Sequence, residues 1–154
     1  MARADLARRL VPGRALVTAP PLRVGLLAAS AGGVLGSLAR YGITDRFGPG
    51  LDFPWAVFMI NVVGSALLAS LPLLAVVRAR PWLAVFLGTG VLGGFTTMSA
   101  ASEQTVFLFE HDRGGTAFLY CAGTLIAALV AAGLVSRAVT PAARAGLERD
   151  EADE

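Results

Sequence analysis

Two long uncharged stretches constrain the fold of this sequence more than any other feature. They run roughly from Pro54 to Val77 and from Gly114 to Ser136. A helix rises about 1.5 Å per residue, so each stretch is long enough to cross the ~30 Å hydrocarbon core of a bilayer. The composition agrees, because 55% of the 154 residues are hydrophobic and 16% are charged, far more apolar than a soluble domain. The chain is therefore predicted to be an all-α integral membrane protein.

Two further apolar segments are less regular. The run VGLLAASAGGVLGSLA, residues 24–39, spans a membrane only if its helix continues through Arg40 and Tyr41 toward Ile43, which places Arg40 at the membrane edge or in a wet cavity. The segment from about Trp82 to Glu110 would be ~43 Å long as one helix. Because this is longer than the core requires, we expect the helix to break near its middle. The sequence thus predicts four transmembrane helices.

The two ends of the chain are polar, and we expect both to be mobile tails. Residues 1–21 form a basic N-terminal tail, and residues 139–154 form an acidic C-terminal tail that ends in ERDEADE. The four-helix membrane domain is expected over residues 22–138. A cleaved signal peptide is an alternative for the first apolar run, but its leading segment is unusually long and the run is rich in glycine.

Arginines are distributed unevenly between the two sides of the predicted bundle. With four spans, both termini and the loop between the second and third spans share one side. The other side holds Arg46 and Arg113, against ten arginines on the first side when Arg40 is left out. The ten are Arg3, Arg8, Arg9, Arg14, Arg23, Arg78, Arg80, Arg137, Arg144 and Arg149. Because positively charged loops stay in the cytoplasm, we expect a multi-pass protein of the cell (inner or plasma) membrane with cytoplasmic termini.

Polar side chains inside the apolar spans mark the candidate functional site. The stretch GGFTTMSAA, residues 93–101, either breaks the third span and frees carbonyl oxygens to face a cation, or packs closely against another helix. Asn61 in the second span needs a partner or an anion for its amide. Tyr120 and Thr124 lie four residues apart on one face of the last span. They form either a ladder of hydroxyl donors or pairs with neighbouring helices.

Arg40 has two possible roles, and the glycines before it indicate helix packing. Arg40 either raises the local concentration of anions or anchors the helix at the interface, and the spacing of Gly32 and Gly36 predicts close helix contact. With Cys121 as the single cysteine and His111 as the single histidine, the sequence offers no disulfide framework, metal-ligand spacing or catalytic constellation. We therefore expect neither an enzyme nor a partner of nucleic acid, but a protein surrounded by membrane lipid.

Three motifs, in this order and spacing, jointly resemble the Fluc-type (CrcB) fluoride ion channels. They are GGVLGSLARY in the first span, PWAVFMINVVGS in the second and GTGVLGGFTTMS in the third. The resemblance runs from about Leu26 to Ala132. It implies an antiparallel dimer of four-helix subunits with two narrow fluoride pores and a structural sodium ion (Na+) at the dimer centre. Backbone carbonyls at the break hold that ion in the family, and they map onto Gly93 and Thr96.

The resemblance also implies roles for side chains along the anion path. Asn61 matches the family's pore asparagine and Ser99 a pore-lining hydroxyl, while Tyr120 and Thr124 match the start of its polar track. Arg40 matches the family's arginine in the first span. A narrow path lined by donors replaces the water around fluoride, so cytoplasmic fluoride leaves passively, without an alternating-access cycle.

The sequence departs from the family in the third span. The family pattern TTFSTF contributes the edges of two phenylalanine rings to the anion path, whereas this chain has Met98 and Ala101 at those positions. Gln104 stands where an acidic residue is usual, and Ala128 where the polar track often continues. A homodimer would lack all four rings, and the one-sided arginines indicate a single direction of insertion. A heterodimer with a related subunit that supplies these rings is therefore our hypothesis.

Two functions are alternatives to that of a conducting channel subunit. A nonconducting or partly degenerate subunit of a heterodimeric fluoride channel would keep the packing glycines and the sodium carbonyls and tolerate the loss of pore donors. A small multidrug antiporter would need an embedded carboxylate in its first span, and residues 24–43 contain none.

Overall fold

The computed structural model describes residues 19–47 and 53–152, which are almost entirely helical. Within these residues, four helical stretches are long and apolar enough to cross a membrane: Leu22–Phe47, Trp55–Leu73, Pro81–Glu110 and Gly114–Val139. The elements in chain order are α2 (Leu22–Phe47), α3 (Trp55–Ser70), the 3-10 turn η1 (Leu71–Leu73), α4 (Ala75–Arg78), α5 (Pro81–Ala84), the π-helical segment η2 (Val85–Leu92), α6 (Gly93–Phe95), α7 (Met98–Glu110) and α8 (Gly114–Ala152). The prediction of an all-helical protein with four apolar spans is confirmed.

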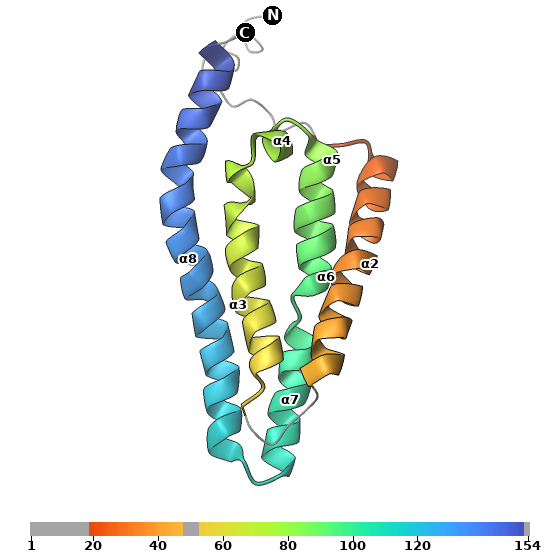
Figure 1. The fold of residues 1–154 in the computed structure, drawn as a ribbon, viewed down its shortest axis with the longest axis vertical. Helices are drawn as coiled ribbons and strands as arrows, with labels where there is room; N and C mark the ends of the chain where they lie inside the picture. The colour runs from red at the N-terminus through yellow and green to blue at the C-terminus, as the bar shows by residue number, and fades with distance from the viewer. Residues whose placement is uncertain (1–18, 48–52, 153–154) are drawn as a thin grey trace, which may run out of the picture.

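The four spans run up and down beside one another (Figure 1). The start of α2, the short helix α4 and the end of α8 lie at one end of the molecule, and the turn between α7 and α8 lies at the other. Helix α2 packs against η2 and α6, whereas α8 packs against α3 and α7. The third span therefore changes its neighbour along its length, from α2 in its first half to α8 in its second.

Small residues allow α2 to approach the third span closely. A side-chain carbon added at Gly36 would collide with the backbone oxygen of Val91, and one added at Gly32 would come within 2.9 Å of the Cα of Gly90. Backbone atoms cannot move aside as a flexible side chain can. The close helix contact predicted from Gly32 and Gly36 is confirmed.

The second span is shorter than the expected helix from Pro54 to Val77. Helix α3 ends at Ser70, and the chain then passes through η1 and an extended residue, Leu74, before α4 begins. Pro72 explains this end, because proline lacks the N–H that an α-helix requires and its ring crowds the preceding turn.

The fourth helix continues beyond its membrane span. The span Gly114–Val139 agrees with the uncharged run that was predicted to end near Ser136, and the backbone then stays helical to Ala152 even though it contains Pro141. Residues 142–151 are mostly Ala, Arg, Leu and Glu, which are strong helix formers. Most of the predicted N-terminal tail, residues 1–21, lies outside the described residues, so its mobility stays a prediction.

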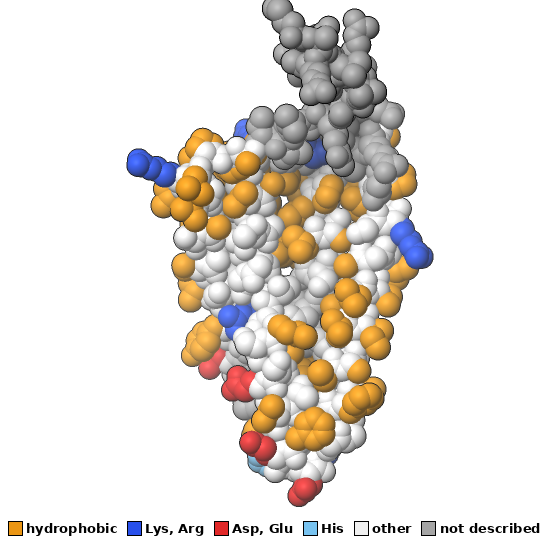
Figure 2. Space-filling model, turned by 180° about the vertical axis from the view of Figure 1, so that it is seen from behind, with side chains coloured by type: hydrophobic (Ala, Val, Ile, Leu, Met, Phe, Trp, Pro, Cys, Tyr) orange, Lys and Arg blue, Asp and Glu red, His pale blue; other side chains and the backbone are white. Residues whose placement is uncertain are grey.

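Most large apolar side chains point outward. Figure 2 shows hydrophobic side chains over the sides of the molecule, while acidic side chains gather near its lower end. A smaller buried cluster joins α3, α7 and α8, and it consists of Val57, Ala101, Leu108, Ala117 and Tyr120. An outward apolar surface with a modest interior is what a multi-pass membrane protein requires, because lipid is the surrounding solvent.

Candidate functional site

The third span leaves helical geometry at two threonines. Thr96 (φ −75°, ψ 149°) and Thr97 (φ −151°, ψ 122°) have extended backbones between the end of α6 at Phe95 and the start of α7 at Met98. The Thr97 side chain caps the new helix, because its Oγ1 accepts a hydrogen bond from the Ala100 N–H at 3.2 Å. A threonine at this position therefore fixes where α7 begins.

Asn61 supplies partners for the backbone that the extended segment exposes. Its Oδ1 accepts from the Thr97 N–H at 2.8 Å, and its Nδ2 donates to the Thr97 carbonyl at 3.0 Å. Both residues are buried, with 8% of Asn61 and 9% of Thr97 exposed. The pairing uses the carbonyl oxygen and one of the two N–H donors of the amide. One N–H of Asn61 remains for another acceptor.

The same hydrogen bonds release two carbonyl groups near the break. In an α-helix the Gly93 carbonyl would accept from the N–H of Thr97, but that N–H donates to Asn61. The Thr96 carbonyl would accept from the N–H of Ala100, which donates to the Thr97 hydroxyl instead. The carbonyls of Gly93 and Thr96 thus lose their helical donors, and Gly93 lies exposed on the surface of the single chain.

Arg40 reaches the break from α2. Its Nε donates to the Gly94 carbonyl at 3.2 Å, and the Ser37 hydroxyl donates to the same oxygen at 3.4 Å. Arg40 also borders an open groove of about 550 Å³ along α2, together with Gly33 and Tyr41. The arginine therefore lies partly buried beside the break with its charge close to the third span.

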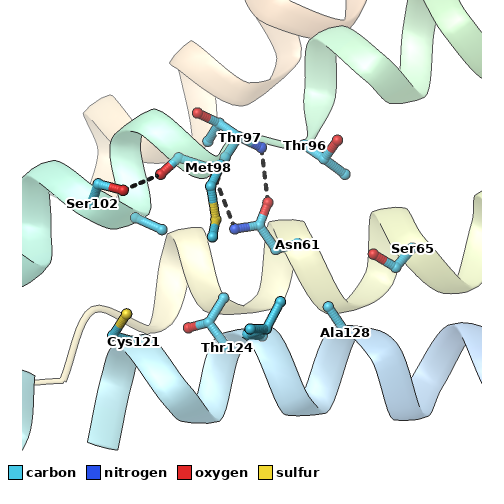
Figure 3. Close-up of a pocket in the computed structure, with 11 residues that line it drawn as sticks. Asn61, Ser65, Thr96, Thr97, Met98, Ser102, Cys121, Thr124 and Ala128 are labelled. Atoms are coloured by element: carbon cyan, nitrogen blue, oxygen red, sulfur yellow. Dashed lines mark hydrogen bonds between the residues drawn. The ribbon is translucent and has the colours of Figure 1, made fainter. Parts of the chain in front are cut away.

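A cavity of about 220 Å³ lies between α3, the break, α7 and α8. Figure 3 shows its labelled residues arranged around the space between these elements. It is lined by Asn61, Ser65, Thr96, Thr97, Met98, Ala101, Ser102, Cys121, Thr124, Leu125 and Ala128. Five of the nine candidate site residues thus meet at one cavity, namely Asn61, Thr96, Met98, Ala101 and Thr124.

Ser99, Tyr120, Arg40 and Gly93 do not line this cavity. The Ser99 hydroxyl is 3.2 Å from that of Thr97, and Ser99 is exposed on the single chain. Tyr120 is fully buried and its hydroxyl donates to Gln104 Oε1 at 2.6 Å.

The hydroxyl proton of Thr124 has a partner within the helix. Thr124 Oγ1 donates to the Tyr120 carbonyl at 2.6 Å, and 4% of Thr124 is exposed. The two hydroxyls expected to form a donor ladder, those of Tyr120 and Thr124, therefore both donate to protein groups here, and towards the cavity Thr124 offers its oxygen.

Met98 and Ala101, where the resemblance noted in the sequence leads us to expect phenylalanines, differ sharply in environment. Met98 is 64% exposed, whereas Ala101 is 5% exposed and packs in the buried cluster with Val57 and Leu108. The small side chains of Ala101 and Ala128 leave the cavity open between α7 and α8.

No group of three His, Cys, Asp or Glu residues able to hold a metal ion occurs in the described part of the chain. The oxygen atoms at the break are uncharged: they belong to backbone carbonyls and to the hydroxyl groups of Thr96, Thr97 and Ser99. Such oxygens suit hard cations, and unwound helices in membrane proteins coordinate Na+ in this way.

Sequence reasoning assigned no role to several residues of the cavity, including Ser65, Ser102 and Cys121. Ser65 could have been found, because it follows Asn61 by four residues and so shares its helix face. Cys121 precedes Thr124 by three residues and could have been placed in the same way.

Comparison with known proteins agrees with this architecture. A family model described as "CrcB-like protein, Camphor Resistance (CrcB)" matches residues 27–135. The fluoride-specific ion channel FluC of Ruegeria sp. (strain TM1040) is 40% identical over 123 residues, which cover 75% of this chain and 97% of the relative. The protein of that name from Caulobacter vibrioides (strain NA1000 / CB15N) is 42% identical over 125 residues, covering 74% and 96%.

A further relative is the fluoride-specific ion channel FluC 2 of Bacillus subtilis (strain 168), which is 43% identical over 100 residues, covering 64% of this chain and 75% of the relative. All three relatives are named as ion channels rather than enzymes. Because the family model covers most of the chain and the identities reach about two fifths over nearly the whole of two relatives, this chain belongs to the CrcB family.

Proposed function

We propose that this chain is a subunit of a passive, fluoride-selective channel that exports cytoplasmic fluoride. The observation that carries the proposal is the cavity beside the break, where the second N–H of Asn61 lies among otherwise apolar spans in a chain whose relatives are named as fluoride channels. Fluoride is small and strongly hydrated, so a pore must replace its water with closely placed donors. A fixed path of this kind needs no transport cycle.

The pore is completed by a second subunit. Ser99 and Met98 are exposed on the single chain although both belong to the proposed anion path. Side chains that serve a narrow anion path cannot remain open to lipid, because an ion beside them would then face hydrocarbon that offers it no donors. An antiparallel dimer of four-helix subunits would cover them and form two pores.

A structural sodium ion fits the freed carbonyls at the centre of that dimer. Gly93 and Thr96 each offer an oxygen without its helical donor, and Gly93 lies exposed, where a second subunit can reach it. Two subunits would supply four such oxygens, which is a suitable set for a hard cation. The bound ion would join the subunits, and together with Arg40 it would attract fluoride towards the pore.

The distribution of charge supports cytoplasmic termini and a heterodimer. Arg23, Arg78, Arg80 and Arg137 belong to the end of the bundle that holds the start of α2, the helix α4 and the later part of α8. The opposite end carries Arg46 and Arg113, and the acidic side chains visible in Figure 2 gather there. Such a chain inserts in one direction. An oppositely inserted relative with phenylalanines in its third span would then complete the pores.

The second candidate is a nonconducting or partly degenerate subunit of such a heterodimer. Its support is the absence of both rings at Met98 and Ala101, together with the hydroxyl protons of Tyr120 and Thr124, which donate to protein groups. In this case the partner's own side chains would have to line a working pore.

Fluoride efflux from liposomes tests these proposals. The chain is purified alone and together with a co-expressed family member that carries both phenylalanines, and release is followed with a fluoride electrode, with chloride release as the selectivity control. Efflux by the co-purified pair and not by the single chain is the expected result. Rapid efflux by the single chain would refute the heterodimer but support the channel.

The nonconducting alternative is tested in the same co-purified pair. Asn61→Asp in this chain keeps an oxygen to accept from the Thr97 N–H but replaces the amide donor with a carboxylate, which repels anions. A clear loss of efflux, in a variant pair that still co-purifies and keeps the thermal unfolding midpoint of the wild type, indicates that this chain lines a pore. Unchanged efflux would favour the nonconducting subunit, and no fluoride release from any preparation would refute the channel proposal.

Removal of sodium tests the proposed cation. The thermal unfolding midpoint of the purified complex is measured in sodium chloride and in N-methylglucamine chloride of equal ionic strength. A ligand that binds only the folded dimer raises this midpoint by mass action, so we expect a lower and concentration-dependent midpoint without sodium. Identical midpoints in the two salts would refute a structural sodium ion.

A further inference from the structure

Ser65 is a cavity-lining residue whose hydroxyl the fold leaves without a partner. It follows Asn61 by four residues on α3, so the two side chains share one helix face, and both line the cavity of about 220 Å³ (Figure 3). Within the described part of the chain, no hydrogen bond involves the Ser65 hydroxyl. An unpartnered O–H in a membrane span is unfavourable unless something in the cavity accepts from it.

Three hydroxyls on the spans that lie near Ser65 or share its cavity behave differently. The Ser70 hydroxyl donates to the carbonyl three residues earlier at 2.7 Å, and those of Ser102 and Thr124 donate to carbonyls four residues earlier at 3.0 Å and 2.6 Å. This bonding to the preceding turn is the usual way in which serine and threonine satisfy themselves in apolar helices. Ser65 therefore differs from Ser102 and Thr124 at the same cavity, because its proton is free to be donated.

Ser65 lies in an otherwise apolar section of the cavity, beyond Asn61 along α3. Leu125 and Ala128 of α8, which also line the cavity, carry no polar side-chain atom. Ser65 lies about 6 Å further along α3 than Asn61, at 1.5 Å per residue. It lies towards the end of the molecule where α4 and its arginine are found.

We propose that Ser65 is a second anion-contacting donor, which receives fluoride from the arginine-bearing end of the molecule and passes it to Asn61. This inference rests on the proposed fluoride channel, since it assigns a step within the same path. Fluoride would accept a hydrogen bond from Ser65 Oγ and then, about one helical turn further on, from the second N–H of Asn61. The spacing gives the ion two successive contacts through an otherwise apolar section.

Fluoride efflux by Ser65 variants tests the proposal, using the full-length chain in whichever dimer conducts. Ser65→Ala removes the donor with little change in volume, and we expect about a tenfold slower efflux, because hydrogen bonds to charged groups are among the stronger ones. Ser70→Ala is the matched control on the same helix and is expected to conduct like the wild type. In Ser65→Ala with Ala128→Ser, a hydroxyl returns from the opposite wall and should restore most of the lost rate.

A chemical readout separates this proposal from the channel proposal. In a Cys121→Ala background, Ser65→Cys and the control Ser70→Cys are treated with a small thiosulfonate reagent in sodium fluoride and in sodium chloride. We expect fluoride to slow modification at position 65 several-fold and to leave position 70 unaffected.

The combined outcomes are distinct. Protection by fluoride without any wild-type efflux would support the Ser65 contact and refute the channel. Wild-type efflux that Ser65→Ala leaves unchanged, with equal modification rates in both salts, would overturn the role of Ser65 while the channel proposal stands. An absence of both efflux and protection would overturn both proposals.

Discussion

Replacing Asn61 with alanine removes the side chain that stabilises the extended segment of the third span. Two hydrogen bonds to the backbone of Thr97, at 2.8 Å and 3.0 Å, are lost together. With only 9% of Thr97 exposed, its N–H and carbonyl have little access to water. The variant therefore leaves a buried donor and a buried acceptor near the middle of the bundle without their partners.

The expected loss of stability follows from these two bonds. An intramolecular hydrogen bond contributes about 1 kcal/mol net, whereas a buried polar group left without a partner costs about 1–3 kcal/mol. Measured polar contacts between membrane helices are weaker, averaging about 0.6 kcal/mol, and the adjacent cavity gives Thr97 some access to water. We therefore expect Asn61→Ala to lower the free energy of unfolding by about 2–4 kcal/mol.

Thr97→Ala is the matched comparison. It removes the hydroxyl that caps α7 but leaves both backbone bonds to Asn61 in place, so it should cost about 1 kcal/mol, the usual value of a helix cap. Unfolding in mixed micelles, followed by tryptophan fluorescence, gives the two free energies, and hydrogen exchange reports the Thr97 amide directly. The reasoning is refuted if Asn61→Ala is no less stable than Thr97→Ala, or if the Thr97 amide stays protected without Asn61.

Three further predictions concern packing, charge and the cavity. Gly36→Ala should lower the unfolding free energy by about 1–3 kcal/mol, because its new methyl meets backbone, whereas Gly42→Ala enters open space and should be neutral; equal stabilities of the two variants in a thermal unfolding assay would contradict this. Arg40→Met keeps a long side chain but loses the hydrogen bond to the Gly94 carbonyl, and should cost about 1–2 kcal/mol in chemical unfolding; a variant as stable as wild type would show that the bond contributes nothing. Ala128→Leu should fill the cavity and slow fluoride efflux at least about tenfold while changing unfolding by less than about 1.5 kcal/mol, and undiminished efflux would place the anion path elsewhere.

The membrane spans could be predicted because they depend on the length and composition of single stretches of sequence. Length and the absence of charge were enough to identify four membrane helices, and Pro72 was a visible signal for the early end of α3. The π-helical geometry of η2 carried no such signal. It lies where α2 approaches through Gly32 and Gly90, so it depends on contact between segments far apart in the sequence.

The sequence singled out several residues that line the cavity, but it did not identify their hydrogen-bond partners. An amide in an apolar span had to pair, yet only the fold identifies the backbone of Thr97 as the partner of Asn61. Burial likewise separates Met98 from Ala101, which are three residues apart and equivalent in the sequence pattern. A position on a helix face can be read from spacing, whereas the neighbour that covers the face depends on tertiary packing.

Asn61 precedes Thr97 in the chain, and this order matters for biosynthesis because the Asn61 amide holds the Thr97 backbone by two hydrogen bonds. Proteins emerge from the ribosome with their N-terminal segments first, so Asn61 is already in the bilayer when the two threonines arrive. When Thr97 leaves water, its N–H and carbonyl can therefore bond directly to the Asn61 side chain. They need not face lipid without a hydrogen-bond partner. A permuted chain that made its third span before its second would lose that advantage, and we expect it to insert less efficiently in a translocation assay.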